Sequence, residues 1–220
     1  SRSRGLGDVY KRQVKSSDLS NYRLGYYSNY YQNDSLYRTN IDLLELNGAK
    51  VVEINPKNIS LPNFRKLLDE DMRRDLVKYF NDYGNENLVV NDIKSIINYN
   101  SLDTINRAPY GQEIFKSIIK DTMSEYDYEL MKEKLLFNGN KFFDLDYNKY
   151  DLDAVISINN YHASYAAVAH NPCLTVPMGF RNDNSPAGLT FIGASKNEQI
   201  LYEIGYAFEQ VSKKRKKPNN

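Results

Sequence analysis

The 220-residue sequence contains one cysteine, no pair of adjacent glycines and no long apolar run. A single cysteine, Cys173, excludes a disulfide framework within the chain and is compatible with a reducing compartment. No apolar segment approaches the roughly 20 residues that span a bilayer, and no segment has the pattern of a secretory signal peptide. We therefore expect a cytoplasmic protein with no membrane partner.

The sequence also lacks an excess of charge of either sign, because its net charge is +1 and its pI is near 7.7. This balance gives no overall attraction to nucleic acid. Two local features could still suggest it: a tyrosine-rich stretch at 22–31 and the basic run KKRKK at 213–217. Aromatic residues are simply favoured in strands, and the basic run is confined to one terminus. We predict no nucleic-acid partner.

The ends of the chain differ in character from the rest. Residues 1–13, SRSRGLGDVYKRQ, show no helical or strand period and resemble a translated library adapter, so we leave them out of fold reasoning. Residues 213–220 are predicted to be a basic disordered tail. The folded part is then expected over residues 14–212.

Hydrophobic periodicity predicts alternating elements in the first part of this region. Residues 22–28 and 50–54 have the composition of strands. Between them, Asp34 or Ser35 can cap a helix that ends at Asn47 and Gly48. A right-handed crossover would make the two strands parallel and close neighbours.

Helical spacing dominates from residue 61 to about 147. The pattern predicts four amphipathic helices, whose apolar positions lie within residues 64–80, 93–97, 114–119 and 130–136. Near the C-terminus, the runs 173–179 and 187–193 predict two strands joined by a polar turn. Ser195 and Glu198 have the spacing of a capping box for a last helix.

The run NPCLTVPMGFRNDNSPAGLTFIGASKNEQILYEIGYAFEQV at 171–211 carries specific letters as well as a pattern. A strand ending in TVP-x-G, a strand of the type P-x-G-L-x-x-I-G and a helix ending in A-x-x-x-E-Q resemble the C-terminal segment of amidase-signature hydrolases. The segment DLDAVISI at 151–158 and the early strand–helix–strand unit also resemble parts of that family. The resemblance implies that residues 14–212 are a partial amidase domain with an α/β/α layered fold and a mixed β-sheet covered by helices.

The family cleaves amides with a serine, a second serine held by a cis peptide, and a lysine base, together with a glycine-rich oxyanion loop. The family also implies no metal and no other cofactor. No Gly-Gly-Ser-Ser loop can be drawn from this chain, and its one Ser-Ser pair, Ser16 and Ser17, adjoins no glycine loop. We therefore predict no catalytic residue and an inactive chain. The intact parent enzyme would hydrolyse a small-molecule or peptide amide.

The resemblance also suggests where a substrate pocket would be walled. Asn159 and Asn160 belong to the run Ser157, Ile158, Asn159, Asn160, which stands where the family tends to carry a Pro-Thr pair. Gln112 precedes a helix that could reach the substrate funnel. We predict these three residues as substrate-binding, with a helix cap or solvated turn as the alternative for Gln112.

Other candidate sites were weaker. Cys173 and His170 could form a thiol dyad, but a buried core cysteine is the favoured interpretation. His162 and His170 lack the ligand spacing of a metal site. The alternative function is a non-catalytic α/β binding or subunit module, such as part of the amidase subunit of a tRNA-dependent amidotransferase. Oligomeric state does not follow from the sequence.

Overall fold

A computed structural model describes residues 18–120 and 122–217. The chain forms two compact units. The sheet unit contains residues 18–60 and 136–217 of the described chain, and the helical unit contains residues 61–135 apart from 121. The adapter-like segment 1–13 and the Ser16–Ser17 pair lie outside the described residues.

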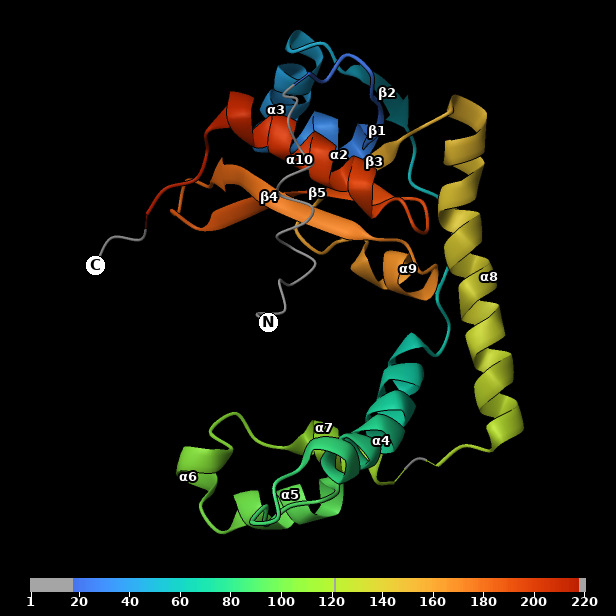
Figure 1. Cartoon of the computed structure of the whole chain (residues 1–220), viewed down its shortest axis with the longest axis vertical. Coiled ribbons are helices and arrows are strands. Elements are labelled where there is room, and N and C mark those ends of the chain that lie inside the picture. Colours follow the sequence, from blue (N-terminus) through green and yellow to red (C-terminus); the bar gives the residue numbers. More distant parts are fainter. Residues whose placement is uncertain (1–17, 121, 218–220) are drawn as a thin grey trace, which may run out of the picture. The chain divides into compact units, whose positions relative to one another are not determined.

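The sheet unit is built on a five-stranded mixed sheet (Figure 1). Its strands follow the spatial order β2-β1-β3-β5-β4. β1 pairs in parallel with both β2 and β3, whereas β5 is antiparallel to both β3 and β4. The bounds are Arg23–Tyr27 for β1, Lys50–Ile54 for β2, Ala154–Ile158 for β3, Cys173–Phe180 for β4 and Pro186–Gly193 for β5. The predicted α/β class and the parallel pairing of the first two strands are confirmed.

Helices α2, Ser28–Asn33, and α3, Ser35–Leu46, connect β1 to β2. Asp34 is the N-cap of α3, and its carboxylate accepts a hydrogen bond of 3.0 Å from the backbone N–H of Tyr37. Arg181, from the turn between β4 and β5, forms an ion pair of 2.9 Å with the same carboxylate. The cap therefore also ties the α3 end to the β4–β5 hairpin.

Two apolar clusters lie on opposite faces of the sheet and make three layers. On one face, α3 and α10, Glu198–Ser212, pack on buried residues of β3, β4 and β5. A Cβ at Gly205 would lie 2.4 Å from Leu174 Cδ2, so α10 approaches β4 closely because this position has no side chain. On the other face, the end of α8, Glu125–Tyr150, and α9, Ala163–Val168, cover the sheet with Phe142, Phe143 and Tyr147.

The start of α10 corrects one sequence prediction. Its N-cap is Asn197, and no side-chain hydrogen bond caps this end. The proposed capping box of Ser195 and Glu198 is therefore wrong, because the helix begins two residues later than that motif requires.

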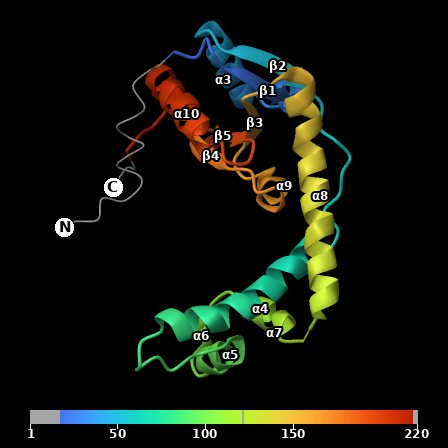
Figure 2. The same ribbon diagram turned by 45° about the vertical axis from the view of Figure 1, so that its right-hand side comes forward.

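The helical unit contains α4, Phe64–Tyr83, α5, Ile93–Ser101, α6, Thr104–Arg107, and α7, Glu113–Ile118, with the beginning of α8 (Figure 2). The buried residue of α4 is Glu70, which is 2% exposed and accepts hydrogen bonds from Arg73 and Arg74. Burial alone would raise the pKa of Glu70, but these two guanidinium groups lower it below its usual value. These ion pairs within α4 offset the cost of burying the Glu70 carboxylate.

Candidate functional site

The carboxyl ends of the parallel strands offer the first candidate position. In α/β sheets, ligands commonly bind beyond these ends. Asn159 follows β3 directly and has a backbone φ of 47°, a left-handed conformation that asparagine adopts more readily than most residues. Three hydrogen bonds to β5 fix this residue. Its backbone N–H donates to the Gly188 carbonyl (2.9 Å), its Oδ1 accepts from the Gly188 N–H (2.7 Å), and its carbonyl accepts from Thr190 Oγ1 (2.6 Å).

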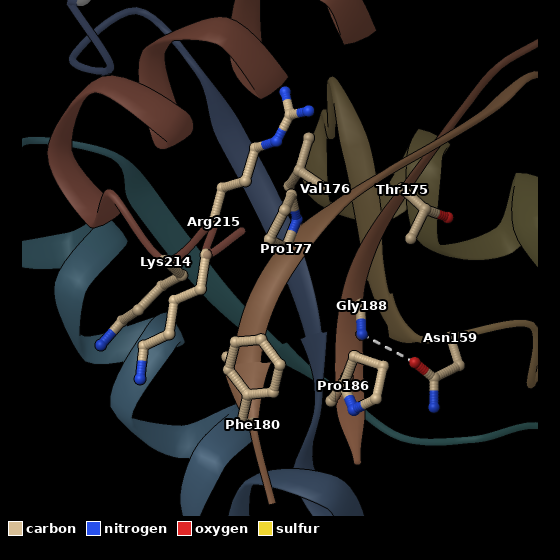
Figure 3. Close-up of a pocket in the computed structure, with 12 residues that line it drawn as sticks. Asn159, Thr175, Val176, Pro177, Phe180, Pro186, Gly188, Lys214 and Arg215 are labelled. Atoms are coloured by element: carbon tan, nitrogen blue, oxygen red, sulfur yellow. Dashed lines mark hydrogen bonds between the residues drawn. The ribbon is translucent and has the colours of Figure 1, made fainter. Parts of the chain in front are cut away.

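A hollow of about 450 Å³ opens beside Asn159 along the β4–β5 hairpin (Figure 3). Its wall combines residues of β4 and β5 with three cationic residues from the segment after α10. The residues that line it are Asn159, Thr175, Val176, Pro177, Gly179, Phe180, Pro186, Ala187, Gly188, Lys214, Arg215 and Lys216. No acidic side chain lines this hollow, so it suits neutral polar or anionic groups.

The three predicted substrate-binding residues have different surroundings. Asn159 lines the hollow. Asn160 is exposed and is not among the lining residues, and its carbonyl accepts a hydrogen bond from the N–H of Ala163 at the start of α9. Gln112 belongs to the helical unit, where its Nε2 donates to Ser101 Oγ at 3.1 Å and to the Ile97 carbonyl at 3.4 Å. The structure therefore places one of the three at a hollow, and the binding roles stay predictions.

Ser157 of β3 and His162, the N-cap residue of α9, form a buried serine–histidine pair. Ser157 Oγ and His162 Nδ1 are 2.7 Å apart, and the imidazole stacks on Tyr27 with ring centroids 4.4 Å apart. Ser157 has no exposed surface and His162 is 7% exposed. Burial lowers the pKa of His162 to about 4, which makes it a weak base. A nucleophile needs access to substrate and an effective base, so this pair is structural.

Cys173 corrects the expectation of a core cysteine. It lies in β4 at the margin of the sheet, and its residue is exposed. Partial desolvation nevertheless raises the pKa of its thiol, so the thiolate form is disfavoured at neutral pH. The sequence pattern missed this exposure because an apolar strand has the same composition in the centre of a sheet and at its margin.

Within 18–120 and 122–217, no group of three or more histidine, cysteine, aspartate or glutamate side chains is arranged to hold a metal ion. Over the same ranges, none of the helices combines the length and the apolar character needed to cross a bilayer.

Known proteins resemble this chain over nearly its full length. A "Probable amidase" of Arabidopsis thaliana is 28% identical over 223 residues, which cover 95% of this chain and 42% of that protein. The crystal structure of an amidase family protein from Bacillus anthracis str. Ames superposes with a TM-score of 0.85 at 29% identity, covering 96% of this chain and 42% of that one. The chain is a homologue of the amidases.

A third relative shows the same fold at lower identity. The native peptide amidase of Stenotrophomonas maltophilia matches with a TM-score of 0.82 and 24% identity, over 96% of this chain and 47% of that enzyme. No protein-family model matches the chain. The chain thus spans less than half the length of each of these amidase relatives. The resemblance to amidase-signature hydrolases seen in the sequence is confirmed.

Proposed function

We propose that this chain forms part of an amidase-signature hydrolase that cleaves the C–N bond of a carboxylic amide. The observation that carries the proposal is the similarity to amidases over 95% and 96% of the chain. In this proposal the sheet unit contributes pocket wall through Asn159, and the 220-residue chain alone does not turn over an amide. The Ser157–His162 pair supports the absence of turnover by the chain alone, because both residues are buried and His162 is a weak base.

Amide hydrolysis sets requirements that explain this division. The carbonyl carbon must be attacked by an activated oxygen nucleophile, the developing oxyanion must be stabilised, and the leaving nitrogen must receive a proton. Each well-aimed oxyanion donor contributes about 3 to 4 kcal/mol to the transition state. In this scheme the hollow beside Asn159 binds and orients the amide substrate. Bond cleavage is assigned to the Ser, cis-Ser and Lys that the family resemblance implies outside residues 14–212.

The test compares two proteins. The purified 220-residue chain is assayed with p-nitroacetanilide and with a peptide amide, and we expect no release of p-nitroaniline or ammonia above the buffer rate. The same chain, extended by the coding sequence upstream of Val14, should hydrolyse one of these amides. A serine-modifying reagent should abolish that activity. Turnover by the 220-residue chain that the same reagent blocks would refute the proposal.

The subunit alternative is separable by purification. A chain that acts as part of the amidase subunit of a tRNA-dependent amidotransferase requires partner subunits. Co-purification of the extended chain with such subunits, together with no hydrolysis of free amides in their absence, would favour that alternative.

A further inference from the structure

The basic run at residues 213–217 follows α10 and lies against the β4–β5 hairpin. Lys213 ends the helix with a left-handed backbone φ of 47°, and its N–H donates to the Glu209 carbonyl at 3.2 Å. The helix itself packs closely on β4. Three of the residues that follow Lys213 line the hollow beside the hairpin: Lys214, Arg215 and Lys216.

The two lysines of this segment are associated with Phe180. Lys216 Nζ lies 5.2 Å from the centroid of the Phe180 ring, which also lines the hollow. Figure 3 shows the Lys214 side chain extending to the Phe180 side of the segment, whereas the Arg215 side chain extends the other way past Val176. Among residues 18–120 and 122–217, neither lysine forms a salt bridge or donates a side-chain hydrogen bond. Each ammonium group therefore keeps its three N–H donors for a ligand.

The rest of the hollow offers apolar surface without negative charge. Pro177, Phe180 and Pro186 line it, and Figure 3 shows these three rings between the basic segment and Asn159. No aspartate or glutamate is among the lining residues. The rings can remove the apolar part of a ligand from water, and the lysines can pair with a negative charge. A negative group attached to an apolar body uses both kinds of surface.

We propose that this hollow binds an organic carboxylate. The anionic head contacts the ammonium groups of Lys214 and Lys216. The apolar body lies against the rings of Pro177, Phe180 and Pro186. Inorganic phosphate can make only the first of these contacts, because it has no apolar part. This inference goes beyond the proposed function, which concerns the bond that is cleaved and not the charge of the ligand.

Two sources can supply such a carboxylate. Hydrolysis of a carboxylic amide releases an acid, which would bind here as a product. An amide substrate that carries a separate carboxylate would bind here through that group. Benzoate represents the first source and 4-carbamoylbenzoate represents the second. Benzamide has the same ring without a charge and is the neutral control.

The experiment measures binding to the 220-residue chain at neutral pH and low ionic strength, and it needs no turnover. Each ligand is titrated while ¹H–¹⁵N spectra record the backbone N–H signals of Gly179 and Gly188, which line the hollow. We expect benzoate to bind roughly three- to tenfold more tightly than benzamide or inorganic phosphate. Tighter binding of 4-carbamoylbenzoate than of benzoate would identify an acidic substrate as the source, and equal or weaker binding would identify the product acid.

Two double variants with the same net charge separate this site from general attraction by the basic run. Lys214→Gln/Lys216→Gln removes the two cations beside Phe180, so benzoate should bind roughly three- to tenfold more weakly and benzamide should change by less than about twofold. Lys213→Gln/Lys217→Gln removes two cations that do not line the hollow. This control should bind benzoate within about twofold of the unmodified chain.

Equal affinity of the unmodified chain for benzoate and benzamide would overturn the inference, and so would phosphate binding as tight as that of benzoate. Absence of saturable benzoate binding would overturn it as well. An equal loss of benzoate affinity in the two double variants would also overturn it, because the attraction would then come from the run as a whole. These outcomes are independent of catalysis: an extended protein that fails to hydrolyse amides would remove the proposed function and leave carboxylate binding in place.

Discussion

Acidification should destabilise the sheet unit through His162. This imidazole is 7% exposed, stacks on Tyr27 and has its pKa lowered to about 4 by burial, whereas an unfolded histidine has a pKa near 6.5. Between these two values, the unfolded chain binds a proton that the folded chain does not. The contribution of His162 to the free energy of unfolding is therefore fully present above about pH 6.5, and it is lost as the pH decreases towards 4.

The magnitude follows from the two pKa values. From pH 7 to pH 5, the free energy of unfolding should fall by about 2 kcal/mol from His162 alone, and the full loss below pH 4 is about 3 kcal/mol. Chemical unfolding at both pH values measures the first quantity. A histidine ¹H NMR titration of the folded chain measures the pKa directly.

The other histidine provides the control. His170 is exposed, and asparagine tolerates its positive φ of 57°, so His170→Asn should retain the pH dependence. His162→Phe keeps an aromatic ring beside Tyr27 and removes the titrating group, so most of the difference between pH 7 and pH 5 should disappear. A folded-state His162 pKa near 6.5, or an unchanged pH dependence in His162→Phe, would refute the reasoning.

Two packing predictions test the layers on either side of the sheet. Tyr37 is fully buried, and its hydroxyl donates to the Ile156 carbonyl at 2.8 Å. Tyr37→Phe should therefore lower the free energy of unfolding, measured in urea, by about 2 kcal/mol. A change within experimental error would show that this hydrogen bond makes no net contribution to stability. At Gly139, a Cβ would lie 2.9 Å from the Ala169 backbone nitrogen and 2.7 Å from Val168 Cγ2. Gly139→Ala should therefore destabilise the protein by about 1 kcal/mol or more, although alanine has the better helix propensity. Lys141→Ala, at an exposed position of α8, should not destabilise it and is the control. Stabilisation by Gly139→Ala would contradict the close packing of α8 on α9.

The strands and most helices could be predicted because their patterns are local. Alternation and turn residues located β1 and β2, and Asp34 was one of two expected caps for α3. The helix α4 shows the limit of periodicity. Leu68, Met72 and Val77 fit an apolar face in the sequence, yet all three are exposed in the structure. Periodicity identifies a stripe but not whether another element covers it.

The candidate site could be predicted only in part. Asn159 was found because it departs from a family pattern at the end of a strand. Thr175 and Gly188 were missed, because their meeting depends on the register in which Thr175 pairs with Thr190 and Pro177 with Gly188. The Ser157–His162 contact was missed for a related reason. A turn brings residues five positions apart together, and no periodic pattern reports such a turn.

The helical unit lies between β2 and β3 in the sequence, and this affects when the sheet can assemble during synthesis. Leu24 of β1 pairs with Ala154 of β3, so the centre of the sheet stays incomplete until residues 55–153 have been translated. At typical synthesis rates of about 5–20 residues per second, β1 and β2 wait for several seconds with one flank open. The nascent chain therefore presents an unpaired edge of β1 to non-native strand pairing for that interval.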